Sequence, residues 1–138
     1  MRNECDTKSL AGEVLKYIDI DPEKDEILLT TESGRQILIH HVQDCYESVA
    51  IEGTDGEWRE LVGKPLVEVT QEETEGGEPP SEYSESWTRT TLMFKVNDAT
   101  VISRWIGESN GYYSESVDIC ELTRPMARDK RHCVSGEE

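Results

Sequence analysis

Two pairs of alternating segments, each joined by a short polar turn, constrain the fold of this chain more than any other feature. Residues 26–41 are divided by Glu-Ser-Gly, and residues 87–106 are divided by Asn97-Asp98. Side chains along a strand point alternately to its two faces, and Gly, Asn and Asp accept the backbone angles of tight hairpin turns. The sequence therefore predicts two antiparallel hairpins.

The alternation also predicts which side chains enter the core. In the first hairpin Ile37 and Ile39 share a face with His41, whereas Leu38 shares the other face with His40. The residues expected inward elsewhere are Leu92, Phe94 and Val96 in the second hairpin and Val117 and Ile119 in a last strand over residues 113–122.

Further strands are expected over residues 13–21, 47–52 and 66–70. One short helix is predicted over residues 56–62, with Asp55 as its cap and Gly63 at its end. The fold class is therefore α+β, mainly β, with an antiparallel sheet of about seven or eight strands.

The length of 138 residues is sufficient for one domain. We expect a flexible N-terminus over residues 1–11, a globular domain over residues 12–122, and a basic tail over residues 123–138. The tail is expected to be flexible or to fold back on acidic surface. Residues 71–86 hold six Glu and no Lys or Arg, which predicts a long acidic loop. Only 35% of the residues are hydrophobic, so the core is modest and a homodimer would supplement it.

The formal charge of −16 is the strongest overall signal for function. It disfavours direct binding to nucleic acid or anionic membranes and favours a host protein with a basic surface. An acidic surface also keeps a protein soluble without any partner. We see no signal peptide and no apolar run of the roughly 20 residues that a membrane span needs. We therefore expect a cytoplasmic location, in which the cysteines stay reduced.

A mixed polar group follows the first hairpin at His41, Asp44, Cys45 and Glu47. These residue types can bind zinc, but no paired metal-ligand spacing is visible. A catalytic thiolate at Cys45 is disfavoured because acidic neighbours raise the pKa of a thiol. We expect a strand-end bulge here, with no metal, no cofactor and no catalytic residue.

A second polar stretch runs from Arg104 to Asp118 and combines an arginine, a turn and several aromatic residues. It can form a simple turn between strands, or a small pocket if it meets the stretch 41–49. Such a pocket would suit a nucleotide-like ligand. Its residues would be His41, Gln43, Asp44, Arg104, Trp105, Ser109, Asn110, Tyr112 and Tyr113.

Three motifs together resemble a family of small phage and bacterial proteins with a domain of unknown function. They are His-x-Gln-Asp-Cys-x-Glu-Ser-Val at 41–49, Leu-Val-Gly-Lys-Pro-Leu at 61–66, and Arg-Trp-x-Gly-Glu-Ser-Asn-Gly-Tyr-Tyr-Ser-Glu-Ser-Val-Asp at 104–118. The resemblance covers about residues 27–122. Tyr46 stands where the family has a second cysteine, which weakens a thiol-pair or metal hypothesis. The family implies a phage or prophage setting and supplies no activity.

Our first functional hypothesis is a non-enzymatic phage accessory protein in the bacterial host cell. By analogy with other small acidic phage proteins, it would inhibit a nucleic-acid-handling defence complex as an anti-CRISPR-like nucleic-acid mimic. The carboxylates that would replace backbone phosphates are Glu72, Glu73, Glu75, Glu78, Glu82 and Glu85. The alternative is a ligand-binding module such as a nucleotide-signal sponge. A third hypothesis is an enzyme that uses His41 with Asp44 or Cys45.

Overall fold

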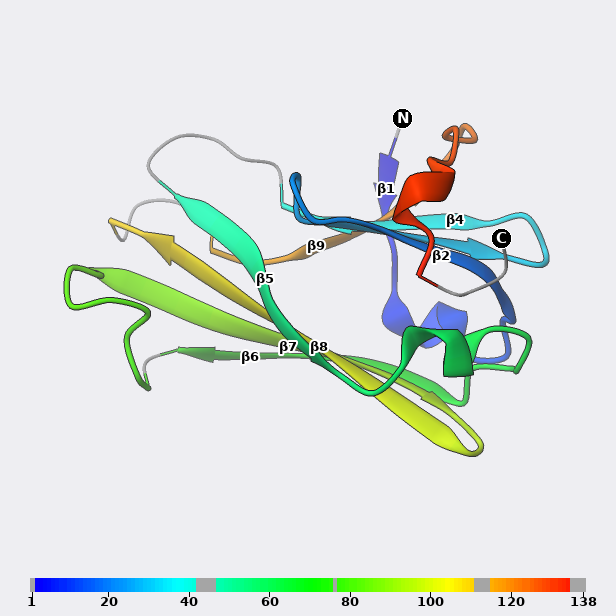
Figure 1. Cartoon of the computed structure of the whole chain (residues 1–138), viewed down its shortest axis with the longest axis horizontal. Helices are drawn as coiled ribbons and strands as arrows, with labels where there is room; N and C mark the ends of the chain where they lie inside the picture. Colours follow the sequence, from blue (N-terminus) through cyan, green and yellow to red (C-terminus); the bar gives the residue numbers. More distant parts are fainter. Residues whose placement is uncertain (1, 42–46, 76, 111–114, 135–138) are drawn as a thin grey trace.

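Two antiparallel sheets pack face to face in the computed structural model of the chain (Figure 1). The structure describes residues 2–41, 47–75, 77–110 and 115–134. The five-stranded sheet has the order β1-β9-β4-β3-β2, and the four-stranded sheet has the order β5-β8-β7-β6. The mainly β, antiparallel fold class is confirmed, with nine strands in the described residues.

The strands of the first sheet are β1 (Arg2–Glu4), β2 (Leu15–Asp21), β3 (Glu26–Thr31), β4 (Gln36–His40) and β9 (Asp118–Leu122). Those of the second are β5 (Ser48–Asp55), β6 (Glu68–Glu75), β7 (Ser86–Val96) and β8 (Ala99–Ser109). Three short 3-10 helices accompany them: η1 (Thr7–Leu10), η2 (Trp58–Leu61) and η3 (Lys130–His132).

Both predicted hairpins are confirmed. Strands β3 and β4 pair across a turn in which Gly34 has a φ of 98°, in the left-handed region. Strands β7 and β8 pair from Val96↔Ala99 to Ser86↔Ser109. The predicted alternation of buried side chains holds along the second half of β7, whereas all five residues of β4 are buried.

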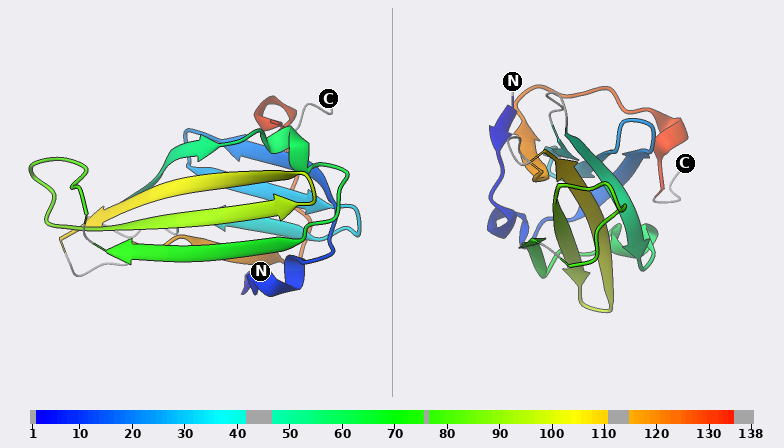
Figure 2. Two further views of the ribbon diagram at one scale, coloured as in Figure 1. Left: turned by 90° about the horizontal axis from the view of Figure 1, so that it is seen from below. Right: turned by 90° about the vertical axis from the view of Figure 1, so that its left-hand side faces the viewer.

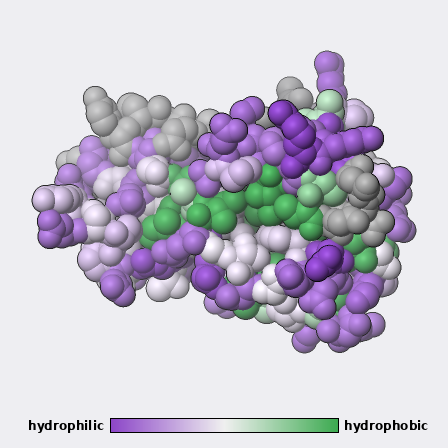
Figure 3. Space-filling view, viewed as in Figure 1, coloured by the Kyte–Doolittle hydropathy of each residue, from purple (hydrophilic) through white to green (hydrophobic). Residues whose placement is uncertain are grey.

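The inner faces of the two sheets form one hydrophobic core. Its buried members include Ile37 and Ile39 from the first sheet and Leu92, Phe94 and Val96 from the second, as predicted. Val117 and Ile119 are buried as well. Figure 3 shows hydrophobic residues in a band across the middle of the molecule, between hydrophilic residues above and below.

The C-terminal segment covers the outer face of the first sheet (Figure 2, right). Leu28 and Leu38 point away from the central core, yet they are only 5% and 1% exposed. Two hydrogen bonds, of 3.1 and 2.6 Å, join the Gln36 side chain to the backbone of Met126. The central strands β3 and β4 are therefore largely buried on both faces.

Arg128 anchors this segment to the edge strand β2. Its guanidinium donates two hydrogen bonds to the carboxylate of Asp19, at 2.8 and 3.0 Å, and lies 3.5 Å from the centre of the Tyr17 ring. Further along, the Val134 amide donates to the carbonyl of Ile18 at 2.9 Å. Residues 126–134 thus fold back on acidic surface, which was one of the two outcomes expected for the tail.

Three expectations need correction. The predicted helix over 56–62 is the 3-10 helix η2, and Asp55 ends β5 and pairs with Arg104 instead of capping it. The N-terminal segment forms β1 and η1, with Leu10 buried. The acidic segment 71–86 is strand as far as Glu75, because its backbone pairs with β7 from Glu68↔Lys95 to Glu75↔Thr88.

Within the described ranges, none of the helices has the length and apolar character needed to cross a bilayer.

The arrangement around Arg128 predicts a large effect of Arg128→Ala. The change removes the partner of Asp19, which is 5% exposed, so an uncompensated buried carboxylate remains. We expect a loss of about 2–4 kcal/mol in the free energy of unfolding, measured by urea denaturation. Arg131→Ala is the control, since that side chain is 85% exposed, and it should leave the free energy of unfolding nearly unchanged. Equal losses for the two variants would contradict the anchoring role of Arg128.

Candidate functional site

The two polar stretches that the sequence singled out meet at one end of the sandwich. Strand β5 begins opposite the end of β8, with Ser48 paired to Glu108 and Val49 paired to Gly107. At the end of β4, His41 lies between Glu47 and the Ser116 backbone. The described parts of both stretches therefore form one polar end of the molecule.

His41 and Glu47 form a buried pair whose side chains are only 4% and 2% exposed. The Ser116 carbonyl oxygen lies 2.8 Å from His41 Nδ1, and Glu47 Oε2 lies 3.3 Å from Nε2. Because a carbonyl can only accept, Nδ1 carries a hydrogen and donates it. The contact between Nε2 and Oε2 joins the end of β4 to the residue before β5.

Glu115 is a second buried carboxylate, 8% exposed, beside this pair. Ser109 Oγ donates to it at 2.5 Å and Thr88 Oγ1 at 2.8 Å. Burial acts to raise the pKa of Glu115, but hydrogen bonds from Ser109, Ser86 and Thr88 outweigh it and hold the pKa below its ordinary value of 4.5. Glu115 is therefore an ionised group that ties the end of β8 to the start of β7.

Gly107 allows the chain to pass this close to Glu115. A Cβ atom at residue 107 would lie 2.2 Å from the Glu115 carbonyl oxygen and 2.9 Å from its Cβ. The backbone of β8 can approach only because glycine has no side chain. This gives a physical reason for the glycine in the stretch 104–118.

The residues proposed for a ligand pocket are not all brought together. Trp105 is 1% exposed in the core, and its Nε1 donates to Ser103 Oγ at 3.0 Å. Arg104, its neighbour on β8, points to the opposite face of the sheet and pairs with Asp55. Ser109 contacts Glu115, and Asn110 is exposed. Gln43, Asp44, Cys45, Tyr112 and Tyr113 lie outside the described residues.

A hollow of about 500 Å³ opens beside the polar end. Its walls come from the start of β5, the end of β8 and the loop before β7, and Ser84 Oγ donates to Glu108 Oε1 at 2.6 Å across it. The residues that line it are Glu47, Ser48, Tyr83, Ser84, Glu85, Glu108, Ser109 and Asn110. Three carboxylates and no Lys or Arg in this lining favour a cationic occupant over a phosphate-bearing one.

The six glutamates proposed as phosphate substitutes lie on β6 and on the loop that follows it. Glu72, Glu73 and Glu75 are exposed on β6, which is an edge strand of its sheet. Glu78, Glu82 and Glu85 are exposed in the loop. Figure 2 (left) shows this loop beyond the ends of β6 and β7. Arg89 holds it there by a 2.6 Å hydrogen bond to the Glu78 carbonyl.

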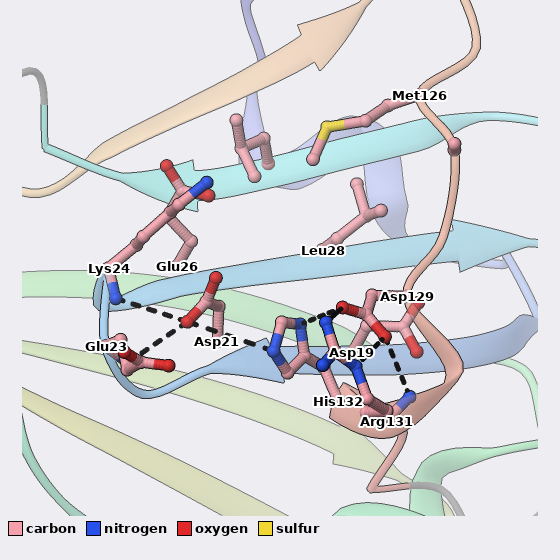
Figure 4. A pocket seen from close by; sticks show the side chains of 12 residues that line it. Asp19, Asp21, Glu23, Lys24, Glu26, Leu28, Met126, Asp129, Arg131 and His132 are labelled. Carbon is pink, nitrogen blue, oxygen red and sulfur yellow. Dashed lines mark hydrogen bonds and ion pairs between the residues drawn. The ribbon is translucent and has the colours of Figure 1, made fainter.

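One pocket was not predicted from the sequence. A space of about 400 Å³ lies between the C-terminal segment and strands β2 and β3 (Figure 4). Leu28 and Met126 line one side of it, while Asp21, Asp129 and His132 line the other. It exists only because the tail folds back, so no local sequence pattern could have revealed it.

Among the described residues, no group of three His, Cys, Asp or Glu side chains is arranged to hold a metal ion. Burial raises the pKa of the Cys5 thiol above its ordinary value of 9.0, so this cysteine is not an activated nucleophile.

A family model for a domain of unknown function, DUF7448, matches residues 9–119. The chain belongs to the DUF7448 family. The match covers both sheets except β1 and most of β9, and it includes the polar end, β6 and the loop that follows β6. Comparison with curated proteins and with solved structures finds no match. The function of this DUF7448 domain must therefore be argued from its own residues.

The close passage of β8 by Glu115 predicts that Gly107→Ala destabilises the domain. The added methyl group meets backbone atoms that cannot move independently, so we expect a loss of about 1–3 kcal/mol in urea denaturation. Gly53→Ala is a matched control in β5, where the methyl group would meet only the flexible end of the Arg104 side chain. Similar stability of the two variants would count against the close contact.

The hydrogen bonds to Glu115 predict a pH-dependent effect of Glu115→Gln. Because the pKa of folded Glu115 lies below its ordinary value, the ionised carboxylate stabilises the fold above about pH 4.5. This contribution is lost as the pH falls through the folded pKa. We expect wild type to exceed the variant by about 1–2 kcal/mol at pH 7 and the difference to shrink below pH 4.5. Denaturation curves from pH 3 to 7 measure it, with exposed Glu68→Gln as the control. A pH-independent difference would refute this role.

Proposed function

We propose that this protein is a non-enzymatic binding protein that occupies a cationic, nucleic-acid-binding surface of another protein. Its binding surface is the acidic edge, defined as Glu72, Glu73 and Glu75 of β6 with Glu78, Glu82 and Glu85 of the following loop. We further propose that it is a phage protein that inhibits a host defence complex. This more specific claim rests on the motif resemblance described above.

The observation that carries the proposal is that the acidic edge keeps its charge uncompensated. In the described part of the chain, none of these six side chains forms an ion pair, although Arg89 lies close to the loop. No Lys or Arg occurs between residues 65 and 88. Unpaired carboxylates on one edge resemble a row of phosphates in charge.

Several acidic residues of the first sheet and the segment before it are neutralised by arginines. Arg35 bridges Glu13 and Glu121 at 2.9 and 2.7 Å, and its hydrogen bonds hold the pKa of both carboxyls below their ordinary values. Arg128 forms an ion pair with Asp19 at 2.8 Å. The acidic edge, by contrast, combines six exposed carboxylates with no Lys or Arg between residues 65 and 88, which suits binding to a basic surface.

The ligand-binding alternative has less support from geometry. Trp105 belongs to the core and Arg104 faces away from it, so neither can stack on or neutralise a ligand beside Ser109. The hollow next to Ser109 is lined by carboxylates, which repel a nucleotide. The acidic edge is thus the better supported working surface.

Quantitative capture from infected bacterial cells tests the proposal. We expect the tagged protein to retain a nucleic-acid-binding complex at about 50 mM salt and to release it at about 500 mM, because screening weakens contacts between exposed charges. Substitution of Glu72, Glu73, Glu75 and Glu82 by Gln should abolish capture and inhibition of that complex. Mass spectrometry and a nucleic-acid-binding assay of the captured complex measure both effects.

The control variant removes the same charge elsewhere, with Glu23, Glu32, Glu57 and Glu60 changed to Gln. These four side chains are exposed and lie outside the acidic edge. The control should keep full capture. If both variants capture equally, or if capture is insensitive to salt, the acidic edge is not the binding surface.

A further inference from the structure

Strand β6 has an open backbone edge along its second half. It has a single neighbour in the sheet, β7, and within the described ranges residues 70–75 have no other backbone hydrogen-bond partner. The first part of the strand is flanked by η1, and the residue Leu66 before it is joined to Gly12 and Glu13 by hydrogen bonds of 2.7 and 2.8 Å. In Figure 2 (left), η1 lies near the start of β6, and the end of β6 lies clear of it.

The other sheet edges are covered, interrupted or short. The backbone of β2 is bonded at Leu15 by the Gly63 amide and at Ile18 by the Val134 amide. Strand β5 is broken by a bulge between Ile51 and Gly53, and the Ile51 amide donates to Asp25 Oδ1 at 3.0 Å. Strand β1 has three residues, whereas β6 has eight. Exposed strand edges attract other strands, so the open end of β6 is the edge at which pairing is expected.

A groove beside the first half of β6 could hold part of such a strand. It has a volume of about 380 Å³ and lies between residues 67–71 on one side and Thr7, Lys8 and Ala11 on the other. Val67 lines it and is 48% exposed, which gives one apolar contact for an incoming side chain. The groove and the open edge form one continuous track along β6.

The charges along the track select its occupant. Pairing between two copies of this chain would bring Glu72, Glu73 and Glu75 close to the carboxylates of the other copy, so it is electrostatically opposed. A basic strand is attracted by the same carboxylates. The protein already shows this mode internally, because the segment with Arg128 lies along β2, where Arg128 pairs with Asp19 and Val134 bonds to the Ile18 carbonyl.

We propose that β6 binds an extended basic segment of its partner as an added β-strand. The backbone of residues 70–75 supplies hydrogen bonds to the new strand. Glu73 and Glu75, which share one face of β6, pair with its Lys or Arg side chains, and Glu72 on the other face adds negative charge. This inference rests on the proposed function and adds the binding mode and the kind of partner segment.

The probe is a capped peptide of eight residues, the length of β6, in which Lys alternates with Val or Thr. Two further peptides carry the same sequence with backbone N-methyl groups, one on every Lys and one on every Val or Thr. Amides of alternate residues in a strand point to opposite sides, so N-methylation of only one set removes the hydrogen bonds to β6. Fluorescence anisotropy measures the three dissociation constants.

We expect the parent peptide and one N-methylated peptide to bind alike, and the other to bind at least about tenfold more weakly. Hydrogen exchange of residues 70–75 should slow when the parent peptide binds. The Glu72, Glu73 and Glu75 to Gln variant should weaken all binding, while the Glu23, Glu32 and Glu57 to Gln control should not.

Two outcomes would overturn the inference. Equal binding of all three peptides, without protection of residues 70–75, would show attraction by charge alone and would leave the proposed function standing. No binding of the parent peptide would refute strand addition, whereas the proposed function would still be judged by the salt-dependent capture. The two proposals can therefore fail separately.

Discussion

The packing of two inner sheet faces into one core is the constraint on which the rest of this structure depends. Only 35% of the residues are hydrophobic. Most hydrophobic residues at alternate positions of β3, β4, β7 and β8 belong to that core. Sheets that pack in this way leave strand edges at the sides of the sandwich. The edges must then be covered, interrupted or charged, and the chain uses a different solution at each one. The tail covers β2, Asp25 caps the bulge of β5, and glutamates line β6.

The hairpins and the core were predictable because their signal is local. Alternation along residues 26–41 and 87–106 decides which side chains face inward, whatever the rest of the chain does. The helix over 56–62 was overestimated for an equally local reason. Gly56 and Gly63 both have positive φ angles and bound a segment too short for α-helical hydrogen bonds, so a 3-10 turn forms. Strand β6 was predicted as a loop because Glu is depleted in β-strands. The backbone of β7 nevertheless pairs with residues 68–75, since backbone hydrogen bonds do not depend on the side chains.

The candidate site was predictable only in outline. The two polar stretches meet because they lie at adjacent strand ends. Side chains alternate along a strand, however, so neighbouring residues of one stretch point to opposite faces of the sheet. Arg104 and Trp105 are consecutive on β8 and therefore cannot serve one pocket. Glu115 gave no sign of burial in the sequence, because its partners Ser109 and Thr88 come from other strands. The tail contacts are longer in range still, since Arg128 and Asp19 are 109 residues apart.

Some carboxylates of this protein form ion pairs and others do not, and their positions indicate whether the negative charge serves only solubility. Solubility depends on net charge and would be met as well by carboxylates spread evenly over the surface. Here arginines at 35 and 128 neutralise acids of the first sheet, while the edge of the second sheet has no cation from residue 65 to 88. An acidic edge strand has opposite effects on two kinds of neighbour. It repels another copy of itself and attracts a basic strand, so the feature that prevents aggregation also defines a partner.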